Sequence, residues 1–379
     1  MYLHPRYLKK SDWWLTGAVA ATLGVGLVVL SSAVLLFGPA TAKSLMIKQC
    51  TAIVLGLAAG TALSLLDYAE LRGMYWFLYG INIFLLLLVL LVGTEVNGSK
   101  SWIDFKYFSV QPSEISKVLL VITLSRLLER QERLQAWLDL IPPVLHVLPI
   151  LVLVMLQGDL GTSLVIAAVS VILVYAAGFP GQKVLAALLV CAMGVAGLVY
   201  SHYHFGVNFP LQEHHWERIH TFLYPESDPG GAGYQVMRSK VSIGSGGLTG
   251  QGYRQGALHQ LGYLPFHHTD FIFAVLVEEF GFVGGIAVIG LFGLILYRIS
   301  NVAQMARDQY GALLAVGVGA IIATHVLENI GMTMGVTPVT GIPLPFMSYG
   351  PSALVSCLLA IGLVQSVAIH RDTLTFGKI

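Results

Sequence analysis

The sequence predicts an all-α polytopic membrane protein with about ten transmembrane helices. Hydrophobic residues make up 56% of the chain, charged residues make up only 11%, and the mean hydropathy is +0.75. Soluble domains are about a quarter charged, so a single core cannot bury this much apolar surface and lipid must solvate part of it. The apolar residues also gather in runs close to the roughly 20 residues that a spanning helix needs.

These runs define the expected elements in order. They lie near 13–37, 45–66, 75–93, 113–128, 143–156, 160–178, 182–200, 271–297, 311–335 and 351–369. The fourth, fifth and sixth are short or interrupted, so a rival count of eight or nine spans stays open, with 143–178 as the weak point. The first run lacks a small-residue cleavage site and is interpreted as an uncleaved helix. Neither a soluble domain nor an internal repeat is expected, so residues 1–379 form one transmembrane domain.

The lysines and arginines predict the orientation, because cytoplasmic segments carry an excess of them. With ten spans and an inside N-terminus, the cytoplasmic segments hold Arg6, Lys9, Lys10, Arg72, Arg126, Arg130, Arg133, Lys183, Arg298, Arg307, Arg371 and Lys378. The short outer segments and their helix ends hold Lys43, Lys48, Lys100, Lys106 and Lys117. This bias favours an inside N-terminus and an even number of spans. The segments expected to face outward are 93–112, 156–163, 201–270 and 336–350.

Composition also argues against some functions. The net charge of +1 argues against nucleic-acid binding. The three cysteines, Cys50, Cys191 and Cys357, sit in separate apolar runs without metal-type spacing and are interpreted as packing residues. The long 201–269 loop contains His202, His204, His214, His215 and His220. Their spacing matches no helical zinc pattern, so no metal site is predicted.

The 201–269 loop is aromatic and glycine-rich, and loops of this length are usually functional or disordered. Its aromatic residues favour order, which leaves two interpretations: a structured cap on the bundle, or a substrate-binding element. The spacing from Tyr234 to Ser242 predicts a short helix ended by Gly244. The glycines within 244–252 predict a hinge at which the loop gates an outward cavity.

Asp270 stands where this loop meets the next apolar run. Thr269 or Asp270 could cap that helix, or Asp270 could act as a general base at an outward-facing boundary. This segment alone favours the cap. Glu278 and Glu279 lie about 12 Å deeper by helical rise, where ionisable groups tend to be paired and functional.

The outer segment before the fourth run contains Trp102 and then Gln111-Pro112-Ser113-Glu114. Pro112 suits the first turn of a helix, which Ser113 and Glu114 are expected to cap. Glu114 and Lys117 are spaced to pair on one face. The pair is either a local ion pair in a well-capped helix or a phosphate contact near an outward opening.

Two further outer segments have the same character. Asp159 lies at a helix junction within 157–163, and a rigid Pro/Gly segment at 340–350 includes Ser348 and Tyr349. Non-helical backbone at membrane depth is tolerated where it lines a cavity. Four polar outer segments with charged membrane ends therefore predict one shared outward cavity.

Together these residues resemble the SEDS (shape, elongation, division and sporulation) family. The motifs that carry the resemblance are W-I-D…Q-P-S-E-I-S-K at 102–117, Q-G-D-L-G-T-S at 157–163, G-A-G-Y-Q…I-G-S-G-G-L-T-G-Q-G at 231–252, H-T-D-F-I-F-A-V-L-V-E-E-F-G at 268–281 and P-V-T-G-I-P-L-P-F-M-S-Y-G at 338–350. They follow in order over nearly the whole chain. The N-I-G-M-T at 329–333 favours the elongation, rod-shape branch over the division branch.

The resemblance implies ten spans, cytoplasmic termini, and a peptidoglycan glycosyltransferase that polymerises lipid II at the outer face of the cytoplasmic membrane. The family's catalytic aspartate falls on Asp270, which reverses the preference for a cap. The chain departs from the family at Ser101, where arginine is frequent, and at Pro351, where a second glycine is common. The first departure leaves open which basic side chain serves that loop.

The implied chemistry is an inverting glycosyl transfer in which Asp270 deprotonates the acceptor hydroxyl and cations stabilise the leaving diphosphate. Arg254 is one further candidate cation. The residues expected to bind substrate are Lys117, Glu114, Gln111, Trp102, Asp159, Arg218, Arg238, Lys240, Ser348 and Tyr349. The sequence requires no cofactor and leaves a divalent cation open.

Two other functions remain to be distinguished. A lipid II flippase would use the same cavity, but its polar path should connect both faces, whereas the polar segments here cluster outside. A scaffold without chemistry would leave Asp270 unneeded. The resemblance also implies a class B penicillin-binding protein transpeptidase as partner.

Overall fold

The computed structural model describes residues 10–96, 98–105, 108–131, 134–206, 213–228 and 230–371. Five basic residues of the orientation argument, Arg6, Lys9, Lys106, Arg133 and Lys378, lie outside them. The helices are α2 (Trp13–Ala33), η1 (Val34–Phe37), α3 (Pro39–Leu65), α4 (Tyr68–Leu71), α5 (Tyr75–Val92), α6 (Pro112–Glu129), η2 (Trp137–Leu140), α7 (Ile141–Leu156), α8 (Leu160–Ala176), α9 (Gly181–Phe205), α10 (Glu213–Leu223), η3 (Pro225–Ser227), α11 (Ala232–Ser245), α12 (Ala257–Gln260), α13 (Ile272–Gln304), α14 (Gln309–Thr333) and α15 (Pro351–Ile369). The strands β1 (Thr94–Val96), β2 (Ser99–Phe105) and β3 (Phe108–Val110) pair antiparallel in chain order.

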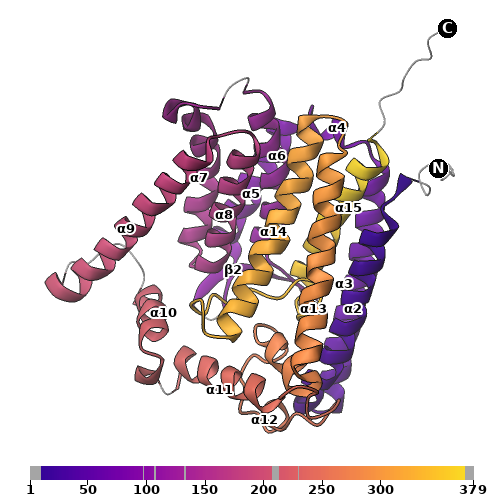
Figure 1. The fold of residues 1–379 in the computed structure, drawn as a ribbon, viewed down its shortest axis with the longest axis vertical. Helices are drawn as coiled ribbons and strands as arrows, with labels where there is room; N and C mark the ends of the chain where they lie inside the picture. Colours follow the sequence, from indigo (N-terminus) through magenta and orange to yellow (C-terminus); the bar gives the residue numbers. More distant parts are fainter. Residues whose placement is uncertain are drawn as a thin grey trace.

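The helical bundle accounts for the predicted spans. Within the described ranges, eight helical segments are long and apolar enough to cross a membrane, and they belong to α2, α3, α5, α7, α9, α13, α14 and α15. Two further helices, α6 and α8, pack among them (Figure 1). The first of these carries four charged residues, and the second has only 17 residues. Among the described residues the bundle therefore has a helix for each of the ten apolar runs, although α3 begins before its run (45–66) and α9 and α13 end beyond theirs (182–200 and 271–297).

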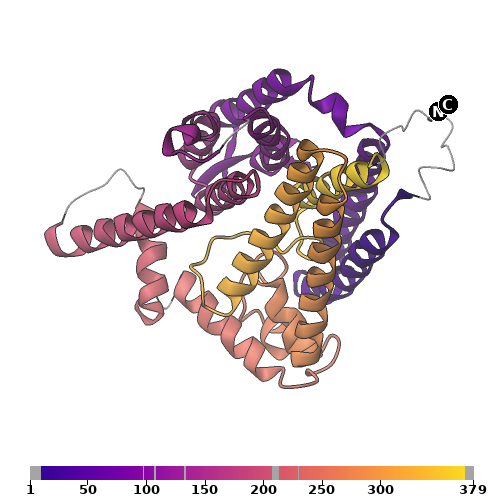
Figure 2. The same ribbon diagram turned by 45° about the horizontal axis from the view of Figure 1, so that its top comes forward.

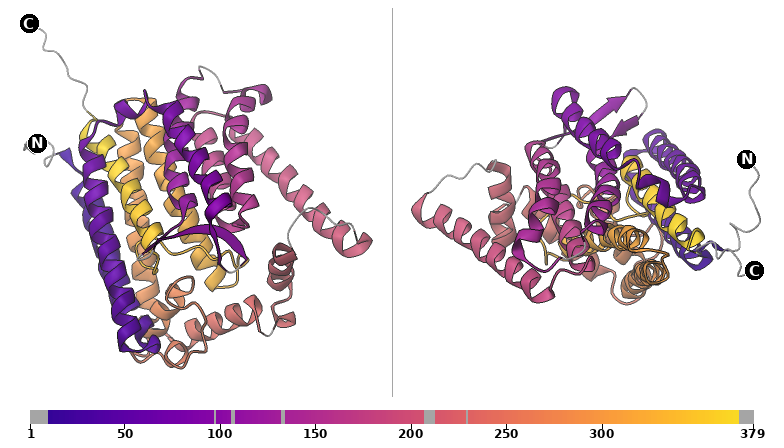
Figure 3. Two further views of the ribbon diagram at one scale, coloured as in Figure 1. Left: turned by 180° about the vertical axis from the view of Figure 1, so that it is seen from behind. Right: turned by 90° about the horizontal axis from the view of Figure 1, so that it is seen from above.

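Small residues let the central helices approach closely. A Cβ added to Gly60 of α3 would lie 2.6 Å from the Leu358 carbonyl oxygen of α15, and one added to Gly362 would lie 2.2 Å from the Gly60 oxygen. Such backbone-to-backbone packing is typical of membrane helices. Within the bundle, α14 and α15 are the most buried of the candidate spans, and they divide it into two sides (Figures 1 and 3).

The end of the bundle where α2 begins and α15 ends is here called the terminal end, and it is fastened by polar contacts. Asp12 receives a hydrogen bond from Arg298 at 2.7 Å, and its backbone N–H donates to Gln365 of α15 at 2.9 Å. Arg72 forms salt bridges to Glu129 at 3.0 Å and Asp308 at 2.8 Å. These contacts join helix ends that are distant in the sequence, and they use basic residues expected in the cytoplasm.

The opposite end, here called the loop end, carries the β-sheet and the 201–269 loop (Figures 1 and 2). This loop is folded as α10, η3, α11 and α12, so its described parts are ordered as predicted. The short helix expected from Tyr234 to Ser242 is α11 (Ala232–Ser245). Gly244, which was expected to end it, lies inside the helix, and Gly246 is the C-cap. Before it, α9 leans away from the bundle (Figures 1 and 3), and none of the described side chains in its apolar window is buried inside the protein.

Candidate functional site

Asp270 lies at the loop end, directly before α13. Phe271 occupies the N-cap position of that helix, and the Thr269 hydroxyl donates to the Phe266 carbonyl at 3.2 Å. The prediction that Thr269 or Asp270 caps α13 is therefore wrong. The Asp270 carboxylate points towards the 340–350 segment instead, because a Cβ added to Gly341 would lie 3.6 Å from Asp270 Oδ2.

The surroundings of Asp270 suit a general base. Burial raises the pKa of its carboxyl group to about 6, although the neighbouring Thr269 side chain and the positive charge of Arg218 act in the opposite direction. A base titrating close to neutral pH is efficient at proton transfer. The influence of Arg218 also places this side chain of α10, predicted to bind substrate, within electrostatic reach of Asp270.

The backbone around Asp270 is held by α14. The amide nitrogen of Asn329 donates to the Asp270 carbonyl at 2.8 Å and to the Ile342 carbonyl at 2.7 Å, and this side chain is fully buried. The Tyr349 N–H donates to the His268 carbonyl at 2.9 Å. Asn329 therefore joins the Asp270 segment to the 340–350 segment. Asn329 is not among the predicted site residues, although it lies in the N-I-G-M-T motif at 329–333.

The predicted pair of Lys117 and Glu114 is confirmed. Lys117 Nζ lies 2.8 Å from Glu114 Oε1 and 2.7 Å from His325 Nε2. Since an ammonium group can only donate, His325 accepts through Nε2 and carries its proton on Nδ1, which faces the Pro343 carbonyl at 3.4 Å. The lysine and the glutamate are only 2% and 3% exposed. The cation is thus enclosed beside the 340–350 segment, with His325 as a contact that sequence reasoning missed.

Asp159 brings two outer segments together. It caps α8 by accepting from the Thr162 N–H at 2.9 Å, and it also accepts from Gln111 Nε2 at 2.9 Å. The Ser113 hydroxyl reaches the same carboxylate at 3.4 Å, while Gln111 occupies the N-cap position of α6. The expectation that Ser113 and Glu114 cap that helix is therefore wrong. Gln111 and Asp159 do meet, as a shared cavity requires.

Glu328 connects these two groups. It is 8% exposed, and the charges of Lys117 and Asp159 and the side chain of Thr340 all act on its carboxylate. Three of the four outer segments thus converge beside α14. Neither Glu328 nor Thr340 was predicted, because a glutamate inside an apolar run gives no sign of which segment it faces.

The remaining predicted residues lie at the same end of the bundle. Ser348 shapes a turn, where its hydroxyl accepts from the Leu344 N–H at 2.8 Å, and the Tyr349 ring lies 5.9 Å from that of His268. Trp102 is half-buried in β2, opposite Thr94. Among the basic residues, Arg238 stacks over Tyr234 and Tyr263, Lys240 extends over Gly335, and Arg254 stacks over Tyr253. In the described part of the chain, no three His, Cys, Asp or Glu side chains are placed to share a metal ion.

Replacing Asn329 by leucine should impair catalysis. The change leaves two buried carbonyl groups without their donor and loosens the Asp270 segment against 340–350. Small misplacements of catalytic groups are costly, so we expect kcat to fall by roughly tenfold to a hundredfold. Steady-state turnover by purified protein measures this effect. Leu327→Ala, at a 71% exposed neighbour, is the matched control. An unchanged kcat in folded Asn329→Leu protein would exclude the positioning role.

Comparison with known proteins places these features in context. The FtsW/RodA/SpoVE family model, described as a cell cycle protein, matches residues 13–373. Peptidoglycan glycosyltransferase MrdB of Escherichia coli (strain K12) is 34% identical over 360 residues, covering 93% of this chain and 93% of the relative. One solved structure is described as the structural coordination of polymerization and crosslinking by a peptidoglycan synthase complex. A chain of that structure superposes with a TM-score of 0.81 at 33% identity, covering 95% of this chain and 98% of that chain. The crystal structure of Thermus thermophilus rod shape determining protein RodA superposes with a TM-score of 0.70 at 31% identity, covering 96% and 98%.

Proposed function

Because the chain belongs to the FtsW/RodA/SpoVE (SEDS) family and is a peptidoglycan glycosyltransferase of cell-wall synthesis, we propose that it polymerises lipid II into glycan strands. The reaction takes place at the outer face of the cytoplasmic membrane, with Asp270 as catalytic base. The observation that carries the proposal is the position of Asp270. It lies at the loop end, directed at Gly341, with the pKa of its carboxyl group raised to about 6 by burial.

The proposed step is a single inverting displacement. The Asp270 carboxylate accepts the proton of the 4-hydroxyl of the acceptor's N-acetylglucosamine. The hydroxyl oxygen bonds to the anomeric carbon of the donor's N-acetylmuramic acid as the bond from that carbon to the diphosphate oxygen breaks. The lipid diphosphate leaves with the electron pair, and the α-linked sugar becomes β-linked. Diphosphate is a good leaving group, so one base suffices where a glycosidase needs two carboxyl groups.

The leaving diphosphate needs positive charge. We assign this role to Lys117, with Arg218, Arg238 and Lys240 from the 201–269 loop closing over the substrate. In the structure Lys117 is shared between Glu114 and His325, so binding of the donor must replace at least one of these contacts with a phosphate oxygen. The wall of the cavity is assigned to Gln111, Trp102, Asp159, Ser348 and Tyr349.

The loop end is assigned to the extracytoplasmic side, with both termini in the cytoplasm. The even number of helices and the basic residues at the terminal end support this orientation. A class B penicillin-binding protein transpeptidase is the proposed partner. The superposed chain comes from a complex described as coordinating polymerization and crosslinking, which supports a crosslinking partner for this protein as well.

Purified protein incubated with purified lipid II tests the function directly. We expect glycan strands resolvable by gel electrophoresis, with a higher rate in the presence of the transpeptidase. A parallel assay measures lipid II translocation across vesicle membranes. Translocation without any polymerisation, with or without the partner, would overturn the proposal in favour of a flippase.

The predicted gating by the 201–269 loop is testable by crosslinking α11 to α14. The Ser239 hydroxyl donates to the Thr333 carbonyl at 2.8 Å, so these two neighbouring positions are chosen for an engineered pair of cysteines. The pair is introduced after replacing Cys50, Cys191 and Cys357. We expect the oxidised protein to polymerise lipid II at least roughly tenfold more slowly than the same protein after reduction, because the loop cannot open to admit substrate. Equal rates before and after reduction would show that the loop does not gate.

A further inference from the structure

The helix that follows Asp270 is broken in the middle. Gly281 has φ +68° and ψ −168°, a conformation that favours glycine, and it divides α13 into a short helix (272–280) and a longer one (282–304). The segment 246–252, here called the splint, bridges the break. The N–H groups of Gln251 and Gly252 donate to the Glu278 and Glu279 carbonyls at 2.9 and 3.0 Å. Across the break, the Phe282 and Val283 N–H groups donate to carbonyls of the splint at 2.9 and 3.2 Å.

The splint has to be glycine-rich to come this close. A Cβ added to Gly246 would lie 2.0 Å from the Val277 oxygen, and one added to Gly250 would lie 2.1 Å from the Glu279 oxygen. These contacts are backbone to backbone, so no side chain can move aside. In this structure the predicted hinge is therefore clamped against α13, and the angle between the two halves of α13 depends on what holds the splint in place.

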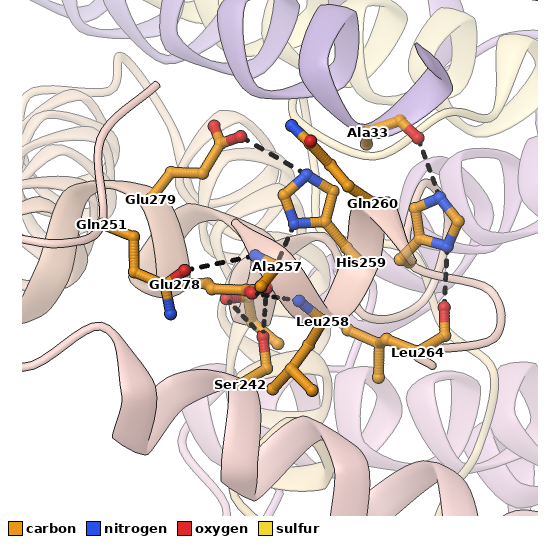
Figure 4. A network of polar contacts seen from close by, with 12 residues as sticks. Ala33, Ser242, Gln251, Ala257, Leu258, His259, Gln260, Leu264, Glu278 and Glu279 are labelled. Atoms are coloured by element: carbon orange, nitrogen blue, oxygen red, sulfur yellow. Dashed lines mark hydrogen bonds and ion pairs between the residues drawn. The ribbon is translucent and has the colours of Figure 1, made fainter. Parts of the chain in front are cut away.

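The side chains of Glu278 and Glu279 fold back from the break and enclose His259 (Figure 4). Glu278 Oε2 lies 3.1 Å from His259 Nδ1, and Glu279 Oε1 lies 3.4 Å from Nε2. All three side chains are at most 1% exposed. Ser242 donates to Glu278 at 2.7 Å, and Ser32 of α2 donates to Glu279. The cluster thus joins the short helix of α13 to α2, α11 and α12, while the backbone contacts of the splint join the short helix to the longer one.

His259 is the cation of this cluster. A carboxylate faces each ring nitrogen, so both nitrogens must carry a proton for both contacts to be hydrogen bonds. Burial lowers the pKa of His259, but the hydrogen bonds to and the charges of Glu278 and Glu279 outweigh it and raise the pKa to about 9. Among the described residues, His267 is the other titratable group that faces it. Its ring centroid is 6.2 Å away, and its Nε2 contacts the Ala33 carbonyl at 2.8 Å.

We propose that His259 is a positioning residue for Asp270. Clamped between Glu278 and Glu279, it ties the short helix that Asp270 precedes to α2, α11 and α12, and so fixes that helix at one angle to the membrane-anchored remainder. Without the cation, two buried carboxylates repel each other, the short helix loses its tie to the neighbouring elements, and the start of α13 tilts away from Gly341. This inference rests on the proposed role of Asp270 as base.

The test is His259→Gln in the full-length protein, assayed by lipid II polymerisation. We expect kcat to fall at least tenfold while KM stays within twofold, because binding groups on α6 and α10 are untouched. His259→Gln/Glu279→Gln removes one carboxylate with the cation, and we expect its kcat to recover at least fivefold over the single variant. His204→Gln, an exposed histidine of α9, is the matched control and should behave as wild type.

A pH profile separates positioning from general stability. The raised pKa means that His259 stabilises the cluster fully below about pH 6.5 and loses this effect as pH rises through about 9. Wild-type kcat should therefore show an alkaline limb near pH 9 that is absent from the double variant. The pH profile of the wild-type protein remains a test even if the His259→Gln variant does not fold. A wild-type kcat that does not fall near pH 9 overturns the proposal.

Two further outcomes count against the proposal: a folded His259→Gln protein with kcat within twofold of wild type, and a folded double variant no faster than the single one. Asp270→Asn is assayed in parallel. It distinguishes failure of the assignment of Asp270 as base from failure of the positioning role of His259. If Asp270→Asn is inactive and His259→Gln is normal, only the positioning role is lost.

Discussion

Replacing Asp270 by asparagine should abolish glycan polymerisation while the protein stays folded. Asparagine keeps the shape of the side chain but cannot take the acceptor's proton, and general bases contribute about 10²–10⁴ in rate. Phe271 occupies the N-cap position, so α13 does not need the carboxylate for its stability. We therefore expect at least a roughly hundredfold loss of rate, measured with purified lipid II, and an unchanged circular-dichroism spectrum.

The pH dependence of the same pair of proteins sharpens this prediction. Because the pKa of Asp270 is raised from 3.8 to about 6, its ionised form is disfavoured in the folded protein. Wild-type activity should rise with pH through about 6 as the base ionises, and Asp270→Asn should be slightly more stable than wild type at pH 7.5. Asp104→Asn, at an exposed carboxylate of β2, is the control. Near-normal polymerisation by folded Asp270→Asn protein would remove the residue from the mechanism.

Replacing Lys117 by methionine should remove both donor binding and a large part of the stability. Glu114 would be left as a buried charge without its cation, and His325 would lose the donor at its Nε2. Breaking a buried ion pair in this way typically costs about 3–5 kcal/mol. We expect a lower melting temperature together with a loss of polymerisation.

A double variant separates these two effects. Lys117→Met/Glu114→Gln leaves no unpaired charge, so the melting temperature should return towards that of wild type. Polymerisation should not return, because the cation assigned to the donor diphosphate is still missing. Full recovery of activity in the double variant would mean that Lys117 serves only to neutralise Glu114.

Much of the fold follows from local features of the sequence. The apolar runs locate the helices, and the i,i+3 spacing of Glu114 and Lys117 correctly predicts their contact. The prediction that Ser113 caps α6 failed because a tertiary partner competed with the local one. The local rule expects Ser113 to cap its own helix. Its hydroxyl instead donates to Asp159, which lies 46 positions away along the chain.

The missed parts of the site share a physical cause. His325 reaches Lys117 across 208 positions, and Asn329 reaches Asp270 across 59, so no periodicity or spacing connects them. In an apolar run, a single polar residue shows that it needs a partner without showing which one. The glycines of the splint are a similar case. The composition of 244–252 indicates conformational freedom, whereas the structure uses the missing side chains for close contact with α13.

The ion pairs at the terminal end have a consequence for the membrane as a permeability barrier. Arg298 with Asp12, and Arg72 with Glu129 and Asp308, fasten the bundle on the side assigned to the cytoplasm. Separation of helices to admit two bulky lipid-linked sugars can then be confined to the opposite leaflet, where α9 already diverges (Figure 1). An enzyme built this way can part its helices in one leaflet while the other remains closed to protons and ions. Its catalytic cycle would then proceed without dissipating the membrane potential of the cell.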